Sequence, residues 1–186
     1  MTLLHLAAQF SSAQVVKALI STGADLEALD DQQSTPLHLA AEFDQSGMVV
    51  NALIKAGANV EARDKFRDLP LHKAARYNQS TDVSMALITA GADVNCLVGH
   101  SLRTPLHLAC LFNPGIVSSL LKAGAWVNIL NIQKQSPLLL AAWKNHKEAV
   151  LALLAHGADV ELGISPLLDS NISSEMKSFL IQNKFT

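Results

Sequence analysis

Seven histidines are the residues of this chain best suited to acid-base or metal chemistry, and four of them recur at nearly regular spacing. His5, His38, His72 and His107 lie 33, 34 and 35 residues apart. If each belongs to one of a series of stacked units, neighbouring rings lie about one helix diameter, ~10 Å, apart. Zinc binds its ligands at ~2 Å, so these rings cannot share one ion. We therefore expect structural histidines, each tying its unit to its own loop, and we expect the other three to be exposed.

The two cysteines, Cys96 and Cys110, are too few for a disulfide framework and match no zinc-binding spacing. For Cys110 we expect a small buried side chain rather than a reactive thiol. Cysteine usage of this kind indicates a reducing, intracellular compartment, with the cytoplasm favoured and the nucleus or a host cell as alternatives. The chain carries no G-x-S-x-G, G-x-G-x-x-G, P-loop or H-E-x-x-H motif, so we predict no enzyme activity, no cofactor and no metal site.

An aromatic residue recurs in each unit, a few positions after the regular histidine or its substitute. The five are Phe10, Phe43, Tyr77, Phe112 and Trp143. If the rings are buried, they fill gaps beside the turns between helices. If they are exposed, they form a ladder suited to a protein partner, because aromatic residues and arginine dominate binding hot spots.

A mixed-charge segment is a further candidate for partner binding. It contains Arg63, Lys65, Phe66, Arg67, Lys73 and Arg76. Counting from the regular histidine places Lys65 and Phe66 at a loop tip and Lys73 and Arg76 on the helix that follows. Asp64 and Asp68 dilute the positive charge, so an ordinary solvated face is the alternative. The functional interpretation is a docking point for an acidic segment of a partner.

The loop that contains Leu97, Val98 and Arg103 is one residue longer than the loop before it, and it is unusually apolar. Apolar residues at a loop tip indicate either a contact with a partner or packing on the next loop. We include these three residues among the candidate contacts.

Short helices must position these side chains. In the segment Thr35 to Ala41, threonine suits the helix N-cap, proline suits the first helical position, and the remaining residues are mostly apolar. Related segments occur at 2–8, 69–75, 104–110 and 136–142. A Gly-Ala pair recurs in step with them, starting at Gly23, Gly57, Gly91, Gly124 and Gly157. Each glycine is expected to end a second helix in the left-handed conformation.

Each second helix should bury one apolar face, and in the first unit we predict a helix over 13–21 with Val15, Val16, Leu19 and Ile20 in the core. In the turns between the two helices, Asp44, Asn78 and Asn113 are residue types that tolerate left-handed backbone.

The double motif, with a period near 33 residues, resembles the ankyrin-repeat family over essentially the full length. The resemblance implies an all-α ankyrin-repeat solenoid of stacked helix-turn-helix units joined by β-hairpin-like loops. We predict a single ankyrin-repeat domain over residues 1–186, with units at about 1–30, 31–64, 65–98, 99–131 and 132–162 and a C-terminal cap at 163–186.

The two ends of the repeat pattern differ from its middle. The first unit should show an apolar flank to water, and a start inside a longer array is favoured over an uncapped unit. In the cap we predict a helix over 173–182 with Met176, Phe179, Leu180 and Ile181 facing the preceding unit. The segment 164–169 is expected to be a shortened loop.

The charge balance excludes a general electrostatic attraction to nucleic acid. Sixteen acidic and fourteen basic residues leave a formal net charge of −2. No run of about 18 apolar residues and no secretory signal pattern is present, so we predict no membrane association.

For function, the resemblance implies a non-catalytic protein-protein interaction module, an adaptor, inhibitor or effector, that binds on the concave face formed by loop tips and first helices. The alternative is a targeting or scaffold segment of a larger enzyme or channel, packing on its own neighbouring domains. We expect a monomer with one protein partner, whose identity stays open. The predicted partner-binding residues are Phe43, Lys65, Phe66, Arg67, Lys73, Arg76, Tyr77, Leu97, Val98, Arg103, Phe112 and Trp143.

Overall fold

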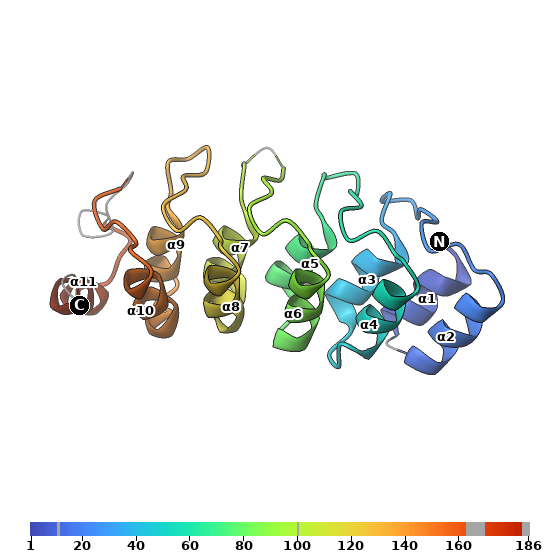
Figure 1. The fold of residues 1–186 in the computed structure, drawn as a ribbon. Coiled ribbons are helices and arrows are strands. Elements are labelled where there is room, and N and C mark those ends of the chain that lie inside the picture. The colour runs from blue at the N-terminus through green and yellow to red at the C-terminus, as the bar shows by residue number, and fades with distance from the viewer. Residues whose placement is uncertain (11, 100, 163–169, 184–186) are drawn as a thin grey trace. The chain divides into compact units, whose positions relative to one another are not determined.

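The computed structural model describes residues 1–10, 12–99, 101–162 and 170–183 and divides into two compact units, Met1–Asp93 and Val94–Thr186. Helix pairs alternate with loops along each unit (Figure 1). The predicted all-α class is confirmed, because the described residues form helices and contain no β-strand beyond an isolated bridge between Val98 and Arg103. A single domain over residues 1–186 stays a prediction.

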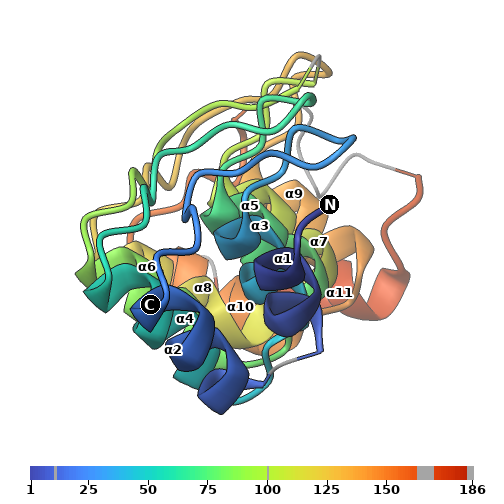
Figure 2. The same cartoon turned by 90° about the vertical axis from the view of Figure 1, so that its right-hand side faces the viewer.

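Unit 1 consists of three helix pairs. They are α1 (Leu3–Gln9) with α2 (Ala13–Ser21), α3 (Pro36–Phe43) with α4 (Met48–Lys55), and α5 (Pro70–Tyr77) with α6 (Thr81–Thr89). The first helices of the pairs, here called inner helices, pack in one layer, and the second, outer helices pack in another (Figure 2). Because each helix has ten residues or fewer, its stability depends on these neighbours.

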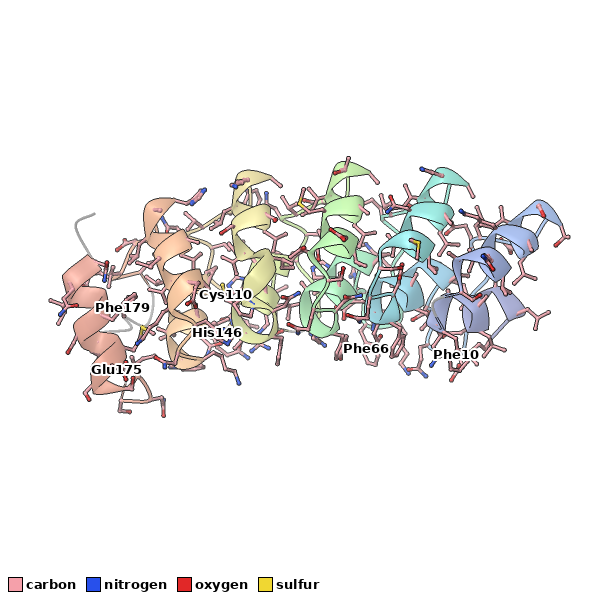
Figure 3. The ribbon with its side chains drawn as sticks, turned by 90° about the horizontal axis from the view of Figure 1, so that it is seen from below. Phe10, Phe66, Cys110, His146, Glu175 and Phe179 are labelled. Carbon is pink, nitrogen blue, oxygen red and sulfur yellow. The ribbon has the colours of Figure 1, made fainter. Side chains whose placement is uncertain are left out.

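Unit 2 follows the same plan. Its elements are α7 (Pro105–Phe112), the short 3-10 helix η1 (Pro114–Ile116), α8 (Val117–Lys122), α9 (Pro137–Trp143), α10 (Lys147–Ala155) and α11 (Ser174–Asn183). Inner helix α7 packs on α9, outer helix α8 packs on α10, and α11 packs on α10. On α11, shown with Glu175 and Phe179 in Figure 3, Met176 and Leu180 are buried as predicted. Ile181 is exposed, so its predicted inward orientation was wrong. The predicted short loop at 164–169 lies outside the described residues.

The regular histidine joins its own helix to the loop that follows. Nδ1 of His38 accepts a hydrogen bond from the Thr35 backbone N–H at 3.1 Å, and Nε2 donates to the Asp68 carbonyl at 3.0 Å. His5 and His107 hold the carbonyls of Ser34 and Gln135 in the same way. The structural role is therefore confirmed for these rings. The prediction that each ring ties its unit to its own loop needs correction, since the distant contact is with the next loop.

The turn between α3 and α4 depends on a buried carboxylate. Oδ2 of Asp44 accepts hydrogen bonds from the backbone N–H groups of Val49 and Val50 at 2.8 and 3.1 Å. The φ angle of Asp44 is −73°, and the left-handed position is taken by Gly47 at 71°. The short polar side chain is thus used as a hydrogen-bond acceptor that begins the next helix, and the expected left-handed conformation does not occur at Asp44.

The predicted core is confirmed in most of the outer helices but only in part in the first, where Leu19 and Ile20 are half-buried. Val16, Val49 and Leu53 are fully buried, but Val15 is 49 % exposed. Val15 borders an open apolar groove of about 300 Å³ between α1 and α2, together with Leu3 and four further apolar side chains. The expected apolar flank of the first helix pair is therefore present.

Candidate functional site

The loops that lead into the inner helices carry half of the predicted binding residues, and each loop is named here as the finger of the helix that follows it. The α5 finger, residues 64–68, is organised by its first residue. Oδ1 of Asp64 accepts hydrogen bonds from the backbone N–H groups of Phe66 and Asp68 at 2.8 and 2.9 Å. This turn places Arg67 in the left-handed region at φ 66° and leaves the Phe66 ring 56 % exposed (Figure 3).

A backbone hydrogen bond connects this finger to the one before it. The Lys65 N–H donates to the Gln32 carbonyl of the α3 finger, residues 30–34, at 3.0 Å. The same type of turn occurs there, since Oδ1 of Asp30 accepts from the N–H groups of Gln32 and Ser34, both at 2.8 Å. Phe66 is therefore presented from a backbone that is fixed on two sides.

Two lysine ammonium groups lie over the Phe66 ring. Nζ of Lys65 is 5.0 Å from the ring centroid, and Nζ of Lys73 on α5 is 5.8 Å from it, distances that allow cation-π attraction. Lys73 also forms an ion pair with Oδ2 of Asp64 at 2.8 Å, with side-chain exposures of 12 % and 0 %. Lys73 thus belongs to the support of the finger, whereas Lys65 and Arg67 are exposed and form no ion pair among the described residues.

Arg76 is the second member of the predicted basic segment that lies near a carboxylate. Its Nη1 is 4.0 Å from Oδ2 of the buried Asp68. Burial raises the pKa of Asp68, and Arg76 partly opposes this effect. Burial also raises the pKa of the half-buried Glu42 on α3, against the influence of Lys73. Acidic side chains therefore balance much of the positive charge on the inner helices of unit 1.

The aromatic residues at the inner-helix ends are partly exposed. In unit 1, Phe10, Phe43 and Tyr77 are exposed, and the Arg76 guanidinium lies 5.7 Å from the Tyr77 ring centroid. In unit 2, Phe112 is exposed and Trp143 is half-buried. The rings are thus not pure gap fillers, and most offer a surface to a partner.

In unit 2, the side chains in the described part of the apolar loop differ in their exposure. Val98 is only 3 % exposed and pairs with Arg103 through two backbone hydrogen bonds of 3.0 and 3.2 Å. Leu97 is exposed and Arg103 is half-buried. The Ser101 carbonyl accepts a hydrogen bond from the Ile132 N–H of the next finger at 3.1 Å. Of the two alternatives for this loop, burial within the protein applies to Val98, whereas Leu97 is accessible to a partner.

The central role of Asp64 was not predicted from the sequence. The sequence suggested only that Asp64 dilutes the positive charge of the segment, but its side chain accepts the hydrogen bonds of the α5 finger turn and forms an ion pair with Lys73. The recurrence of Asp30, Asp64 and Asn131 at one position of the repeat was the available signal.

Cys110 and His146, two further side chains with possible chemical roles, serve the fold instead. Among the described residues, no three His, Cys, Asp or Glu side chains converge on a point where a metal could bind. Cys110 is fully buried, which raises the pKa of its thiol far above the usual range. The Cys110 carbonyl accepts a hydrogen bond from Nδ1 of His146 at 3.0 Å, so His146 is half-buried and not the exposed residue that was predicted (Figure 3). Within the described ranges, no helix has the length and apolar character needed to cross a bilayer.

Comparison with protein families agrees with the repeated helix pairs. A family model described as ankyrin repeats in three copies matches residues 1–64, 45–131 and 71–163. Together these matches extend over residues 1–163, which is most of the chain. Ankyrin repeats are generally protein-protein interaction modules, and their family is typically non-catalytic. The motif spacing, the capped inner helices, the glycine-terminated outer helices and the family match together show that this chain belongs to the ankyrin-repeat family.

Proposed function

We propose that this protein is a non-catalytic adaptor, inhibitor or effector that binds a protein partner through its fingers and inner helices. The α5 finger carries the proposal, because it holds an exposed Phe66 ring on a hydrogen-bonded turn. A ring fixed before binding loses little conformational freedom when a partner covers it. Phe43 and Tyr77 add exposed aromatic surface on α3 and α5 of the same unit.

The partner proposed for this surface combines an apolar side chain with carboxylates. Phe66 would contact the apolar side chain, and Lys65 and Arg67 would attract the carboxylates, since neither is engaged in an ion pair among the described residues. Lys73 and Arg76, which sequence reasoning placed at the centre of such a site, lie beside buried acids and contribute less free charge. An acidic segment thus remains the proposed partner, centred on the finger rather than on α5.

A cross-linking capture experiment tests this proposal. The double variant Phe66→Ala/Arg67→Glu should lose the partner, because truncation of a hot-spot aromatic costs about 2 kcal/mol or more, roughly 30-fold in affinity. The matched control is Trp126→Ala, which removes an equally exposed aromatic outside the fingers. Unchanged capture by the double variant, with a native far-UV spectrum, would refute the proposal.

A second candidate function is favoured by the exposed groove between α1 and α2. Leu3, Phe10 and Val15 give this surface an almost entirely apolar lining, which is suited to packing against another folded element. The protein would then be a targeting or scaffold segment that packs on neighbouring domains of a larger enzyme or channel. Phe10→Ser/Val15→Ser should abolish capture under this second function and leave it unchanged under the first.

A further inference from the structure

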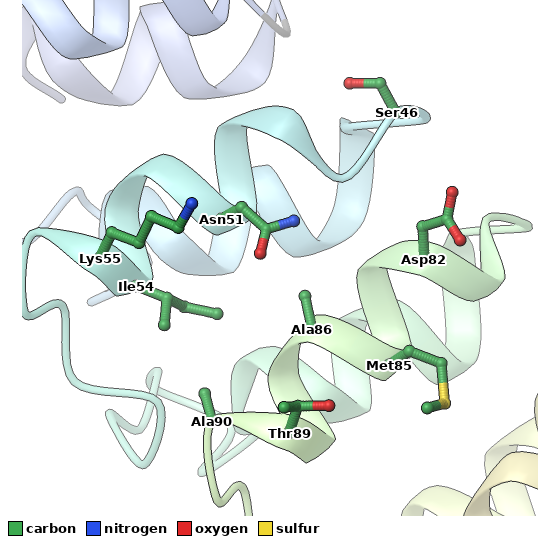
Figure 4. A pocket seen from close by; sticks show the side chains of 9 residues that line it. All are labelled: Ser46, Asn51, Ile54, Lys55, Asp82, Met85, Ala86, Thr89 and Ala90. Carbon is green, nitrogen blue, oxygen red and sulfur yellow. The ribbon is translucent and has the colours of Figure 1, made fainter.

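A second surface of unit 1 lies between the outer helices α4 and α6, away from the fingers (Figures 1 and 4). The two helices border a groove of about 550 Å³. Ile54 of α4 and Ala86 of α6 are its half-buried apolar floor, and Met85 of α6 is an exposed apolar wall. The groove therefore exposes these apolar side chains together with the polar Asn51 and Thr89, on a face that the proposed finger site does not use (Figure 4).

The two ends of this groove carry opposite charges. Lys55 is the last residue of α4, and Asp82 lies in the first turn of α6. Asp82 is beside the beginning of α4, because a Cβ atom added to the N-cap residue Gly47 would lie 3.3 Å from the Asp82 Cβ. The eight steps of the helical rise from residue 47 to residue 55 span ~12 Å, which separates the two charges by about two turns. Both are exposed and, among the described residues, neither takes part in an ion pair.

A helix fits this groove better than an extended segment does. The walls are helices, whose backbone donors and acceptors are already paired internally, so they offer no edge to which an extended chain could hydrogen-bond. A helical ligand satisfies its own backbone and needs to supply only side chains. Insertion of an apolar stripe into a groove of this kind is a general mode of peptide recognition.

The charges also select an orientation. A helix carries partial positive charge at its N-terminus and partial negative charge at its C-terminus, so acidic residues are favoured near the start and basic residues near the end. An acidic residue at the start of the ligand would face Lys55, and a basic residue two turns later would face Asp82. The ligand would run antiparallel to α4, which also opposes the two helix dipoles.

We propose that the α4/α6 groove binds an amphipathic helix of a partner protein, with an acidic residue at its start, an apolar stripe in its middle and a basic residue about two turns after the acid. The apolar stripe covers Ile54, Met85 and Ala86. The acidic residue pairs with Lys55 and the basic residue with Asp82. This site is independent of the fingers and does not require the function proposed above.

Two synthetic helical peptides of identical composition test the proposal. The first carries Glu before and Lys after the same Leu/Ala stripe, and the second carries the two charges exchanged. Fluorescence anisotropy with the whole chain should show binding of both, with the first peptide about three- to tenfold tighter, as expected for two exposed ion pairs. The preference should decrease at high salt.

Two variants then separate specific binding from adhesion to an apolar surface. In Lys55→Glu/Asp82→Lys the preference between the peptides should invert, and because both positions are exposed the fold should be retained. Ala86→Phe should fill the floor of the groove and weaken the binding of both peptides at least about tenfold, as loss of an apolar anchor does. If Ala86→Phe does not fold, the charge inversion still decides. Failure of both peptides to bind, equal binding by the wild type, or an unchanged preference in the inverted variant would overturn the proposal.

Discussion

The α5 and α7 fingers have the same task of turning the chain into an inner helix, and they do it with different chemistry. In the α5 finger, one carboxylate oxygen of Asp64 binds two backbone N–H groups while the other pairs with Lys73. In the α7 finger, the equivalent position is the buried Val98, whose backbone pairs with that of Arg103 through two hydrogen bonds. Both fingers contain backbone hydrogen bonds, such as that from the Asp64 N–H to the Asp68 carbonyl at 3.1 Å, but the α5 finger adds a carboxylate acceptor where the α7 finger has a buried valine.

The α3 and α9 fingers show which part of the Asp64 arrangement serves the turn. In the α9 finger, residues 131–135, Oδ1 of Asn131 accepts from the N–H groups of Gln133 and Gln135 at 2.9 and 3.0 Å. A neutral amide therefore suffices for the turn. The negative charge of Asp64 serves only the ion pair with Lys73. This ion pair holds the Lys73 ammonium group near the Phe66 ring.

Replacement of Asp64 by Ala is expected to have the largest effect. Two backbone donors and the buried end of Lys73 lose their acceptor together, so the free energy of unfolding should fall by about 2–4 kcal/mol. Asp30→Ala in the α3 finger removes the same two turn hydrogen bonds without an ion pair and should cost less. Urea unfolding measures both, and equal losses would show that Lys73 adds nothing.

The histidines that hold the fingers predict a pH dependence. His107 holds the Gln135 carbonyl of the α9 finger, and burial lowers the pKa of His107 to about 4. Between that value and ~6.5, the unfolded chain binds a proton that the folded chain does not. Stability should therefore fall as the pH decreases through this window, by roughly 3 kcal/mol for this residue alone. Burial also lowers the pKa of His38, which adds to the effect.

Two carboxylates with a raised pKa oppose this trend at its acidic end. Burial raises the pKa of Glu42 and Asp68, so the folded chain gains their protons first and is stabilised relative to the unfolded chain as the pH falls. The contribution of His107 is isolated by comparing unfolding at several pH values for the wild type and His107→Gln, whose slope should be shallower. The exposed His156→Gln is the control. Equal slopes in all three proteins would contradict the assignment.

Asp64→Asn separates the turn from the charge. The amide keeps the Oδ1 acceptor, as Asn131 does in the α9 finger, so only the Lys73 pair is lost and the expected cost is about 1–2 kcal/mol. The same substitution should leave the Phe66 backbone in place. Loss of stability as large as in Asp64→Ala would mean that the charge, not the turn, dominates this finger.

The smallest effect is expected at the left-handed residue of the α7 finger. Leu102 has φ 49°, where a Cβ atom is unfavourable. Leu102→Gly should therefore increase the free energy of unfolding by up to about 1 kcal/mol and raise the unfolding temperature slightly. Gln33→Gly, at φ 57° in the α3 finger, should act similarly. Destabilisation by Leu102→Gly in thermal melts would indicate that the exposed leucine side chain packs on the loop.

Much of the fold could be predicted from the sequence because it repeats. Thr35, Pro36 and His38 act on neighbouring backbone, so their spacing predicts a capped inner helix without knowledge of the remaining chain. Each terminal glycine requires a left-handed position, and Gly23 and Gly57 adopt it. Local interactions of this type are visible in sequence, since the interacting groups are at most a few residues apart.

The candidate site was less predictable, because its chemistry depends on partners distant in the chain. Whether Lys73 offers a free charge depended on Asp64, nine positions earlier, and whether Val15 was buried depended on the packing around α2. The sequence alone determined the repeat, the helix pairs and the residues that turn the chain. Only the tertiary structure decided which charges are balanced, which aromatic rings are exposed, and that α4 and α6 leave a groove between them. Burial and charge pairing arise from groups that meet only when the helices stack, whereas caps and turns form within a few residues.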